Sequence, residues 1–135
     1  MSVSEVNKRK VRQFFEEVLN EGRLELIEEL VAKDFLGRLG CIDSALTGPA
    51  GVRRFVSQRR AACPDLYVKI EDQVAEDDRV VTRWRATARR PQPPAATAAR
   101  DPLARCAGIT IIRLLAGKQV DAHTECAGPH GARGE

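Results

Sequence analysis

Apolar side chains in the first half of the chain recur three or four positions apart, which is helical spacing. Ser2 and Glu5 have the spacing of an N-terminal capping box before a first helix. Gly22 suits the left-handed position that follows a helix. A second, short helix is predicted over residues 24–31. The buried stripes of these two helices are Val6, Val11, Phe14, Phe15, Val18 and Leu19, then Leu24, Leu26, Ile27, Leu30 and Val31.

A predicted loop over residues 36–48 separates these helices from a third one. Thr47-Gly48-Pro49 begins that helix, since proline is tolerated in a first turn, and Cys63-Pro64 ends it. Its inner face is predicted to consist of Val52, Phe55 and Val56.

From Leu66 onward the apolar period changes from helical to two, which predicts half-buried strands. The first strand ends at a turn over residues 75–78, and the next covers residues 79–88, with Thr82, Trp84 and Ala86 on one face. Residues 89–102 (RRPQPPAATAARDP) are too rich in proline for a sheet and are predicted to be a long loop. Two further strands are predicted at about 103–114 and 118–126.

Three helices followed by a meander of four strands indicate an α+β architecture, with the helices on one face of a curved antiparallel sheet. A conical hollow between the two layers is a usual place for a small-molecule site. We predict one domain over residues 1–127 and a flexible tail over residues 128–135.

The composition narrows the classes of partner. The chain has 135 residues, of which 43% are hydrophobic and 30% charged, and its net charge is only +3. Acidic residues interrupt the basic ones, so a nucleic-acid partner is not expected. No apolar run reaches the ~18 residues of a membrane span, and no signal peptide is recognisable. The lack of both favours a cytoplasmic location. The four cysteines form no CxxC pair, which favours reduced thiols. No fourth ligand is evident beside His123, Cys126 and His130, so no metal site is expected.

Several stretches of the chain, taken in order, resemble one known family. They are NKRKVRQFFEEVLNEGRLELIEELVAKDF, GPAGVRRFV, CPDL, IEDQVAEDDRVVTRWRATA and GITIIRLLAGKQV. Together they are similar to the SnoaL-like polyketide cyclases of the nuclear transport factor 2-like superfamily. The resemblance runs from about residue 7 to residue 125 and implies the cone-shaped fold of that superfamily. Its members include isomerases, cyclases, dehydratases and binding modules, so the fold alone does not fix the function.

For the activity, the resemblance implies an intramolecular aldol closure of a polyketide in secondary metabolism, such as antibiotic biosynthesis, without metal or cofactor. An acidic residue in the last strand would move protons, and Trp84 occupies the position of a pocket aromatic. The chain departs from this pattern at three places. Gly37-Arg38 replaces the usual Asp-His pair, Ala88-Arg89-Arg90 replaces a Gly-Thr-His segment, and the acid/base pair falls at Thr110 and Thr124.

The last hairpin, which contains Asp121 and His123, can be read in two registers. A type I turn with a glycine bulge at Gly117 would pair Leu114 with Lys118, Ile112 with Val120 and Thr110 with Ala122. Asp121, His123 and Glu125 would then lie with Gln119 on the outer face. A register shifted by one residue would turn the same acidic and imidazole groups into the hollow beside Thr110.

The resulting candidates divide into two groups. Asp121 and His123 are candidate proton carriers, and Arg38 is a candidate for stabilising an oxyanion. Trp84, Arg90, Thr110 and Thr124 are candidate substrate-binding residues. We therefore expect a cofactor-free cyclase or isomerase of a hydrophobic, keto-rich small molecule. The alternative is a non-catalytic small-molecule-binding module that has lost the acid/base pair.

An assembly is also expected. Ile109 and Ile111 would be unusually apolar for a solvent-facing strand surface, which indicates a homodimer formed through the outer face of the sheet.

Overall fold

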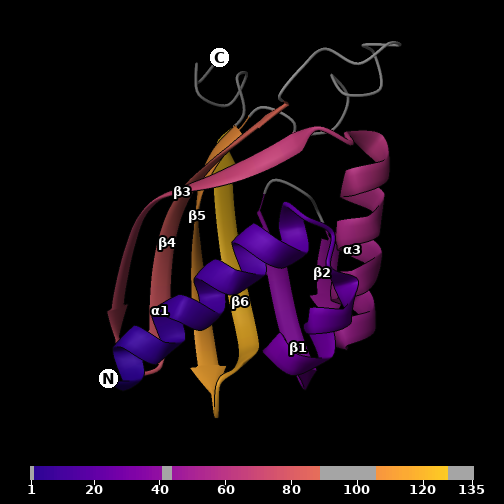
Figure 1. Ribbon diagram of the computed structural model, residues 1–135. Coiled ribbons are helices and arrows are strands. Elements are labelled where there is room, and N and C mark those ends of the chain that lie inside the picture. Colours follow the sequence, from indigo (N-terminus) through magenta and orange to yellow (C-terminus); the bar gives the residue numbers. More distant parts are fainter. Residues whose placement is uncertain (1, 41–43, 89–105, 128–135) are drawn as a thin grey trace.

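The computed structural model describes residues 2–40, 44–88 and 106–127 (Figure 1). The predicted loop at 89–102, with Arg90, and the predicted tail at 128–135 lie outside these residues. The helical elements are α1 (Val3–Gln13), the π-helical η1 (Phe14–Leu19), the 3₁₀ turn η2 (Leu24–Leu26), α2 (Ile27–Leu30) and α3 (Gly48–Ala62). Ser2 caps α1 by accepting a hydrogen bond from the Glu5 amide at 3.1 Å.

Six strands form one mixed sheet in the order β2-β1-β6-β5-β4-β3. Their bounds are β1 (Val31–Leu39), β2 (Ser44–Thr47), β3 (Leu66–Glu76), β4 (Arg79–Ala88), β5 (Cys106–Leu115) and β6 (Lys118–Ala127). The helices lie against one face of this curved sheet, with α1 crossing in front of it and α3 beside β1 and β2 (Figure 1). The α+β architecture and the four later strands are as the sequence predicts.

The predicted loop over residues 36–48 is the main error of the sequence-based fold. Residues 31–39 form β1, which pairs with β2 in antiparallel fashion and with β6 in parallel fashion. The sheet is therefore mixed rather than wholly antiparallel, and the second helix ends at Leu30. Parallel pairing joins segments far apart in the chain, so no local pattern announces it.

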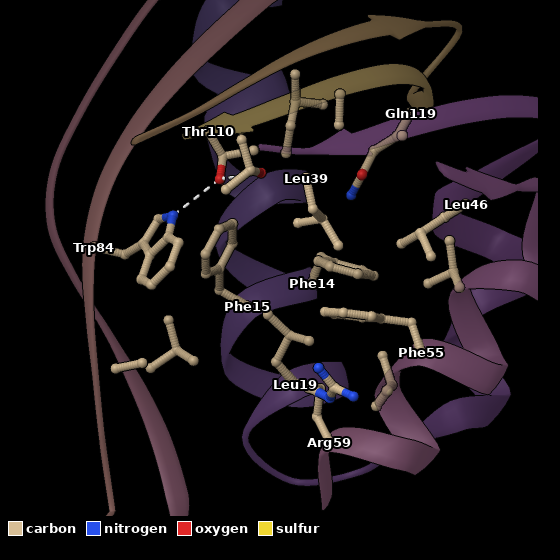
Figure 2. Close-up of a pocket in the computed structure, with 18 of the residues that line it drawn as sticks. Phe14, Phe15, Leu19, Leu39, Leu46, Phe55, Arg59, Trp84, Thr110 and Gln119 are labelled. Carbon is tan, nitrogen blue, oxygen red and sulfur yellow. Dashed lines mark hydrogen bonds between the residues drawn. The ribbon is translucent and has the colours of Figure 1, made fainter. Parts of the chain in front are cut away.

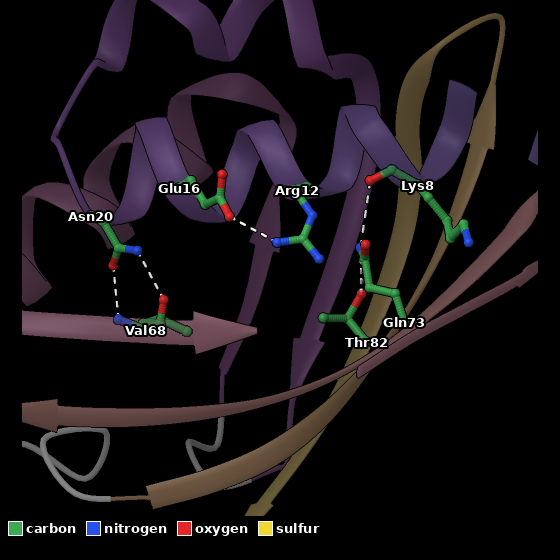
Figure 3. Close-up of polar contacts among 7 residues, drawn as sticks. All are labelled: Lys8, Arg12, Glu16, Asn20, Val68, Gln73 and Thr82. Atoms are coloured by element: carbon green, nitrogen blue, oxygen red, sulfur yellow. Dashed lines mark hydrogen bonds and ion pairs between the residues drawn. The ribbon is translucent and has the colours of Figure 1, made fainter. Parts of the chain in front are cut away.

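The first helix widens where it reaches the hollow. Residues 14–19 are π-helical, and the Asn20 amide donates to the Phe15 carbonyl at 3.2 Å, five residues back. The Asn20 side chain then pairs with the backbone of the edge strand (Figure 3). Its Nδ2 donates to the Val68 carbonyl, and the Val68 amide donates to its Oδ1, both at 2.8 Å. This pair fixes the end of η1 against β3, and Phe14, Phe15 and Leu19 line a cavity.

The apolar core divides into two clusters on either side of that cavity. One cluster, around Trp84 and Ile112, joins α1 and η1 to β3, β4 and β5. The other, around Ile27 and Val56, joins α2 and α3 to β1. Phe14, Leu19, Phe55 and Ala122 pack against both clusters.

The structure also bears on the expectations about membrane spans and cysteines. No helix among the described residues is long and apolar enough to cross a membrane. Cys63 and Cys106 are buried and are not part of a disulfide. Cys126 is disulfide-bonded, so the expectation of reduced cysteines is wrong at Cys126.

Candidate functional site

A partly open cavity of about 120 Å³ lies between the inner face of the sheet and the helices. Its wall is mostly apolar and rich in phenylalanine (Figure 2). This volume is somewhat below the roughly 150 Å³ of a closed apolar cavity that accepts benzene, and the open side of the cavity lets a ligand extend beyond it. The residues that line it are Phe14, Phe15, Leu19, Phe35, Gly37, Arg38, Leu39, Leu46, Val52, Phe55, Val56, Arg59, Arg60, Leu66, Val68, Trp84, Ala86, Thr110, Ile112, Gln119, Ala122 and Thr124.

Three buried polar groups form a hydrogen-bonded chain in one wall of the cavity. The Trp84 Nε1–H donates to Thr110 Oγ1 at 2.9 Å (Figure 2). The hydroxyls of Thr110 and Thr124 are hydrogen-bonded to each other, also at 2.9 Å. Both threonines are 6% exposed and Trp84 is 5% exposed. Thr110 is the central member of the chain, because it alone contacts the other two.

This chain leaves one hydroxyl hydrogen for a ligand. Trp84, Thr110 and Thr124 supply one hydrogen each, and their two hydrogen bonds use two of the three. If Thr110 donates to Thr124, the hydrogen of Thr124 remains, and in the opposite case that of Thr110 remains. Bonds in such a chain polarise one another. The wall therefore presents one strengthened donor, whichever way the two hydroxyls are oriented.

Gly108 sets the position of the indole. It lies opposite Trp84 in the β4–β5 ladder. A Cβ atom at residue 108 would stand 2.5 Å from Trp84 Cζ2 and 2.9 Å from Cys126 Cβ. The missing side chain therefore leaves room for the Trp84 ring against β5, where its N–H donates to Thr110.

A fourth buried polar group lies further along β6. Gln119 is 2% exposed and lines the cavity. Its Nε2 has no hydrogen-bond partner among the described residues. Figure 2 shows its carboxamide directed into the space near Leu39 and Leu46.

The charged groups at the cavity wall are all basic. Arg60 Nη1 donates to the carbonyls of Leu19 at 3.1 Å and Asn20 at 2.8 Å, which holds that side chain at the end of η1. The Arg59 guanidinium carbon lies 5.3 Å from the centre of the Phe55 ring. Among the described lining residues there is no aspartate, glutamate or histidine. The wall thus offers donors and positive charge, which favour a ligand oxygen that carries or develops negative charge.

The last hairpin does not take the predicted turn. Leu115 pairs with Lys118 across a two-residue turn, in which Ala116 and Gly117 both have positive φ. A bulge at Val120 follows, and beyond it Ile112 pairs with Ala122 and Thr110 with Thr124. The predicted pairs Leu114–Lys118, Ile112–Val120 and Thr110–Ala122 are therefore wrong. The predicted outer placement of Asp121, His123 and Glu125 is nevertheless right, and Thr110, Ile112, Ala122 and Thr124 line the cavity on the inner face.

This register places the two candidate proton carriers on the outer face of the sheet. Asp121 Oδ2 accepts a hydrogen bond from Arg113 Nε at 3.0 Å, with about half of the Asp121 side chain exposed. His123 Nε2 lies 2.7 Å from Glu125 Oε2, and both side chains are largely exposed. The alternative register, which would turn Asp121 and His123 into the hollow, is therefore wrong.

The other candidate residues lie partly in the cavity wall and partly elsewhere. Trp84, Thr110 and Thr124 lie together in the cavity wall. Arg38 also borders the cavity, but it is exposed and pairs with His123 across the β1–β6 ladder. Its strand neighbours Gly37 and Leu39 face inward beside Ala122 and Thr124, so the guanidinium projects to the outer face. Arg90 lies outside the described residues.

Sequence reasoning missed Gln119 and the aromatic contribution of η1. Gln119 was expected on the outer face, and Val120 on the inner one. The bulge at Val120 reverses the alternation between Asp121 and Gln119. Phe14 and Phe15 were assigned to a buried helix face, and only the packing shows that they also border a cavity. No group of three or more potential metal ligands occurs within the described ranges.

Comparison with known proteins identifies the family of the chain. The model of the SnoaL-like polyketide cyclase family matches residues 9–126. No curated protein matches the chain in sequence.

Solved structures share the fold. A protein of Jannaschia sp. CCS1 described as a SnoaL-like polyketide cyclase superimposes with a TM-score of 0.75 at 18% identity, covering 93% of this chain and 88% of that one. One of Acidithiobacillus ferrooxidans described as a polyketide cyclase gives 0.73 at 24% identity, covering 99% and 96%. One of Kribbella flavida described as a ketosteroid isomerase gives 0.70 at 18% identity, covering 91% and 78%. The TM-scores establish a common fold, whereas sequence identities this low leave the substrate open.

Proposed function

Because the chain belongs to the SnoaL-like polyketide cyclase family, we propose that it is a cofactor-free cyclase or isomerase of a hydrophobic, keto-rich small molecule. The reaction would take place in the cavity between η1, α3 and the sheet. The observation that carries this proposal is the Trp84–Thr110–Thr124 chain, which ends in one unused hydroxyl hydrogen in an otherwise apolar wall. We place the substrate among polyketide-like compounds of secondary metabolism.

The apolar wall supports a role in confinement. Phe14, Phe15 and Phe55 border the space from the helix side, and Trp84 borders it from the sheet. A flexible substrate held there would lose conformers in which its two reacting carbons are far apart. Such positioning supplies a large part of many enzymatic rate enhancements.

The threonine hydroxyls support a role in charge stabilisation. Removing a proton next to a carbonyl turns the carbonyl oxygen into an enolate oxygen, which accepts hydrogen bonds more strongly than the ketone does. The unused hydroxyl hydrogen of Thr110 or Thr124 would donate to that oxygen. Trp84 would strengthen the donor through Thr110, and the cavity would keep competing water away.

The described lining residues include no group that could accept the proton. Asp121 and His123 lie on the other face of the sheet, and threonine does not exchange protons usefully near neutral pH. We therefore restrict the substrate to compounds with an already acidic C–H bond, such as one between two carbonyls. Water at the open side of the cavity, or a second oxygen of the substrate, would take the proton from such a carbon.

A second candidate function follows from the same observation. A binding module would keep the cavity and the hydrogen-bond donor but would return its ligand unaltered. The lack of a carboxylate or imidazole among the described lining residues favours this alternative.

One experiment separates the two functions. The protein is incubated with a linear poly-β-ketone ester and with androst-5-ene-3,17-dione, and products are followed by mass spectrometry and by the absorbance of the conjugated enone. We expect turnover of at least one probe. Replacing both hydroxyls, in Thr110→Val/Thr124→Val, should lower kcat on the order of 10²-fold. Asp121→Asn and His123→Ala should leave kcat unchanged. Probes that bind and return intact would favour the binding module.

We also propose a homodimer formed through the outer face of the sheet. Ile109 and Ile111 on the central strand β5 are 45% and 43% exposed, although they are large and apolar. Ion pairs surround them on the neighbouring strands, as expected for a polar rim. Light scattering should give twice the monomer mass, and Ile109→Lys/Ile111→Lys should give the monomer mass. A monomeric wild-type protein would overturn this proposal.

A further inference from the structure

Gln119 is a buried polar group in the cavity wall with an energetic cost in the empty protein. Its side chain is 2% exposed, yet its Nε2 has no hydrogen-bond partner among the described residues. Buried amides almost always find a partner, because an unsatisfied donor loses its hydration without compensation. An apolar residue of the same length would fill this position without that loss. Gln119 therefore destabilises the empty protein, which is typical of residues kept for binding.

The position of Gln119 relative to the threonine pair defines a distance. Thr110 pairs with Thr124 and Leu114 pairs with Gln119, so the two polar points are four residues apart along β5. That spacing corresponds to about 13 Å along the strand. Side chains stand roughly perpendicular to a sheet, and allowing about 2.9 Å for each of two hydrogen bonds leaves about 7 Å between the accepting oxygens.

The wall between the two points is apolar. Ile112 and Ala122 face each other there across the β5–β6 ladder and both line the cavity. A ligand that reaches both donors must therefore have a hydrocarbon middle. Two fused six-membered rings with a carbonyl oxygen at each far end have about the required length.

We infer that Gln119 is a specificity-determining residue, whose Nε2–H donates to a second oxygen of a ligand held at its other end by the threonine hydroxyls. The inference rests on the proposed function, because it takes the same cavity as the ligand site. It adds the ligand class, which is a compact polycyclic or cyclising molecule with acceptor oxygens at both ends. Gln119 selects this class against ligands that carry only one oxygen.

The test combines two ligands with two proteins. The probes are trans-decalin-2,6-dione and trans-2-decalone, which differ only in the second carbonyl. Their dissociation constants are measured by NMR titration against the wild-type protein and Gln119→Met, whose side chain matches glutamine in length. The wild-type protein should prefer the dione about 3- to 10-fold, the range of one net hydrogen bond. In Gln119→Met this preference should disappear, and the affinity for the monoketone should stay the same.

The outcomes separate this inference from the proposed function. If both ketones bind the wild-type protein and Gln119→Met keeps the full preference for the dione, Gln119 does not contact the second oxygen and the inference fails alone. If neither ketone binds the wild-type protein, the cavity does not take compact ketones, and the proposed ligand class falls together with the inference.

A stability measurement tests the same residue without any ligand. Because the unsatisfied Nε2 is removed, Gln119→Met should raise the Tm of the empty protein by a few degrees. A purely structural glutamine would give the opposite sign. A Tm below that of the wild-type protein would show that Gln119 makes a stabilising contact, and would overturn the inference.

Discussion

The central position of Thr110 in the cavity wall predicts an order of stability among valine variants. Thr110→Val removes both hydrogen bonds of the chain and leaves the Trp84 N–H without an acceptor at a site where the indole is 5% exposed. An orphaned buried donor costs about 1–3 kcal/mol, and the lost bond between the hydroxyls adds about 1 kcal/mol. We expect Thr110→Val to lower the free energy of unfolding by about 2–4 kcal/mol.

Thr124→Val removes only the bond between the two hydroxyls. Thr110 still accepts from Trp84, and one hydroxyl hydrogen stays unused as it does in the wild type, so the number of unpaired buried donors does not rise. The expected loss is about 0.5–1.5 kcal/mol. Thr87→Val is a matched control, since Thr87 is exposed on the outer face of β4 and should change stability by less than about 0.5 kcal/mol.

Urea unfolding followed by the emission of the single tryptophan measures all three variants. For a domain of this size, a difference of 2 kcal/mol corresponds to roughly 6–10 °C in Tm, so calorimetry can check the order independently. Equal losses in Thr110→Val and Thr124→Val would refute the reasoning. So would a Thr110→Val protein as stable as the wild type.

Three further changes have defined outcomes. Gly108→Ala places a Cβ 2.5 Å from the Trp84 ring. It should lower the free energy of unfolding by about 1–3 kcal/mol and shift the emission maximum of the folded protein. An unshifted spectrum at full stability would contradict the position of the indole. Asn20→Ala removes both bonds to the edge strand β3 and should cost about 1–3 kcal/mol, with faster amide exchange in that strand; unchanged exchange would argue against the anchor. The hydrogen bond from the Arg53 guanidinium lowers the pKa of Glu28. The ionised Glu28 therefore stabilises the fold at pH values above its titration range, and this stabilisation is lost as the pH falls through the lowered pKa. Arg53→Gln should therefore raise the pKa of Glu28 in an NMR titration, and an unchanged pKa would rule out this pair in solution.

Much of the fold could be predicted because its signals are local. Helical spacing predicted α1 and α3, alternation predicted β3 to β6, and Gly22 has the positive φ expected after a helix. The segment Val31–Leu39 was missed because Asp34, Gly37 and Arg38 are atypical of a strand. Its pairing with β6 joins residues about 85 positions apart.

The candidate site was predicted less well, because it depends on the register of one hairpin. Trp84 and Thr110 were placed correctly because alternation along β4 and β5 is regular. Thr124 was placed correctly because it lies beyond the bulge, where the alternation along β6 is regular again. The turn at Ala116 and Gly117 requires positive φ at a non-glycine residue, which sequence reasoning does not expect. The bulge at Val120 then decides whether Gln119 faces the cavity or the solvent.

The most direct test of the account is a titration of Trp84 emission with a panel of compact cyclic ketones, with each sample checked by mass afterwards. Two proteins are compared: the wild type and Ala122→Phe, which fills the cavity between the threonine pair and Gln119. The account predicts a saturable emission change in the wild type and none in Ala122→Phe. A wild-type emission that no ketone changes, or a change that survives in Ala122→Phe, would show that the cavity is not the ligand site.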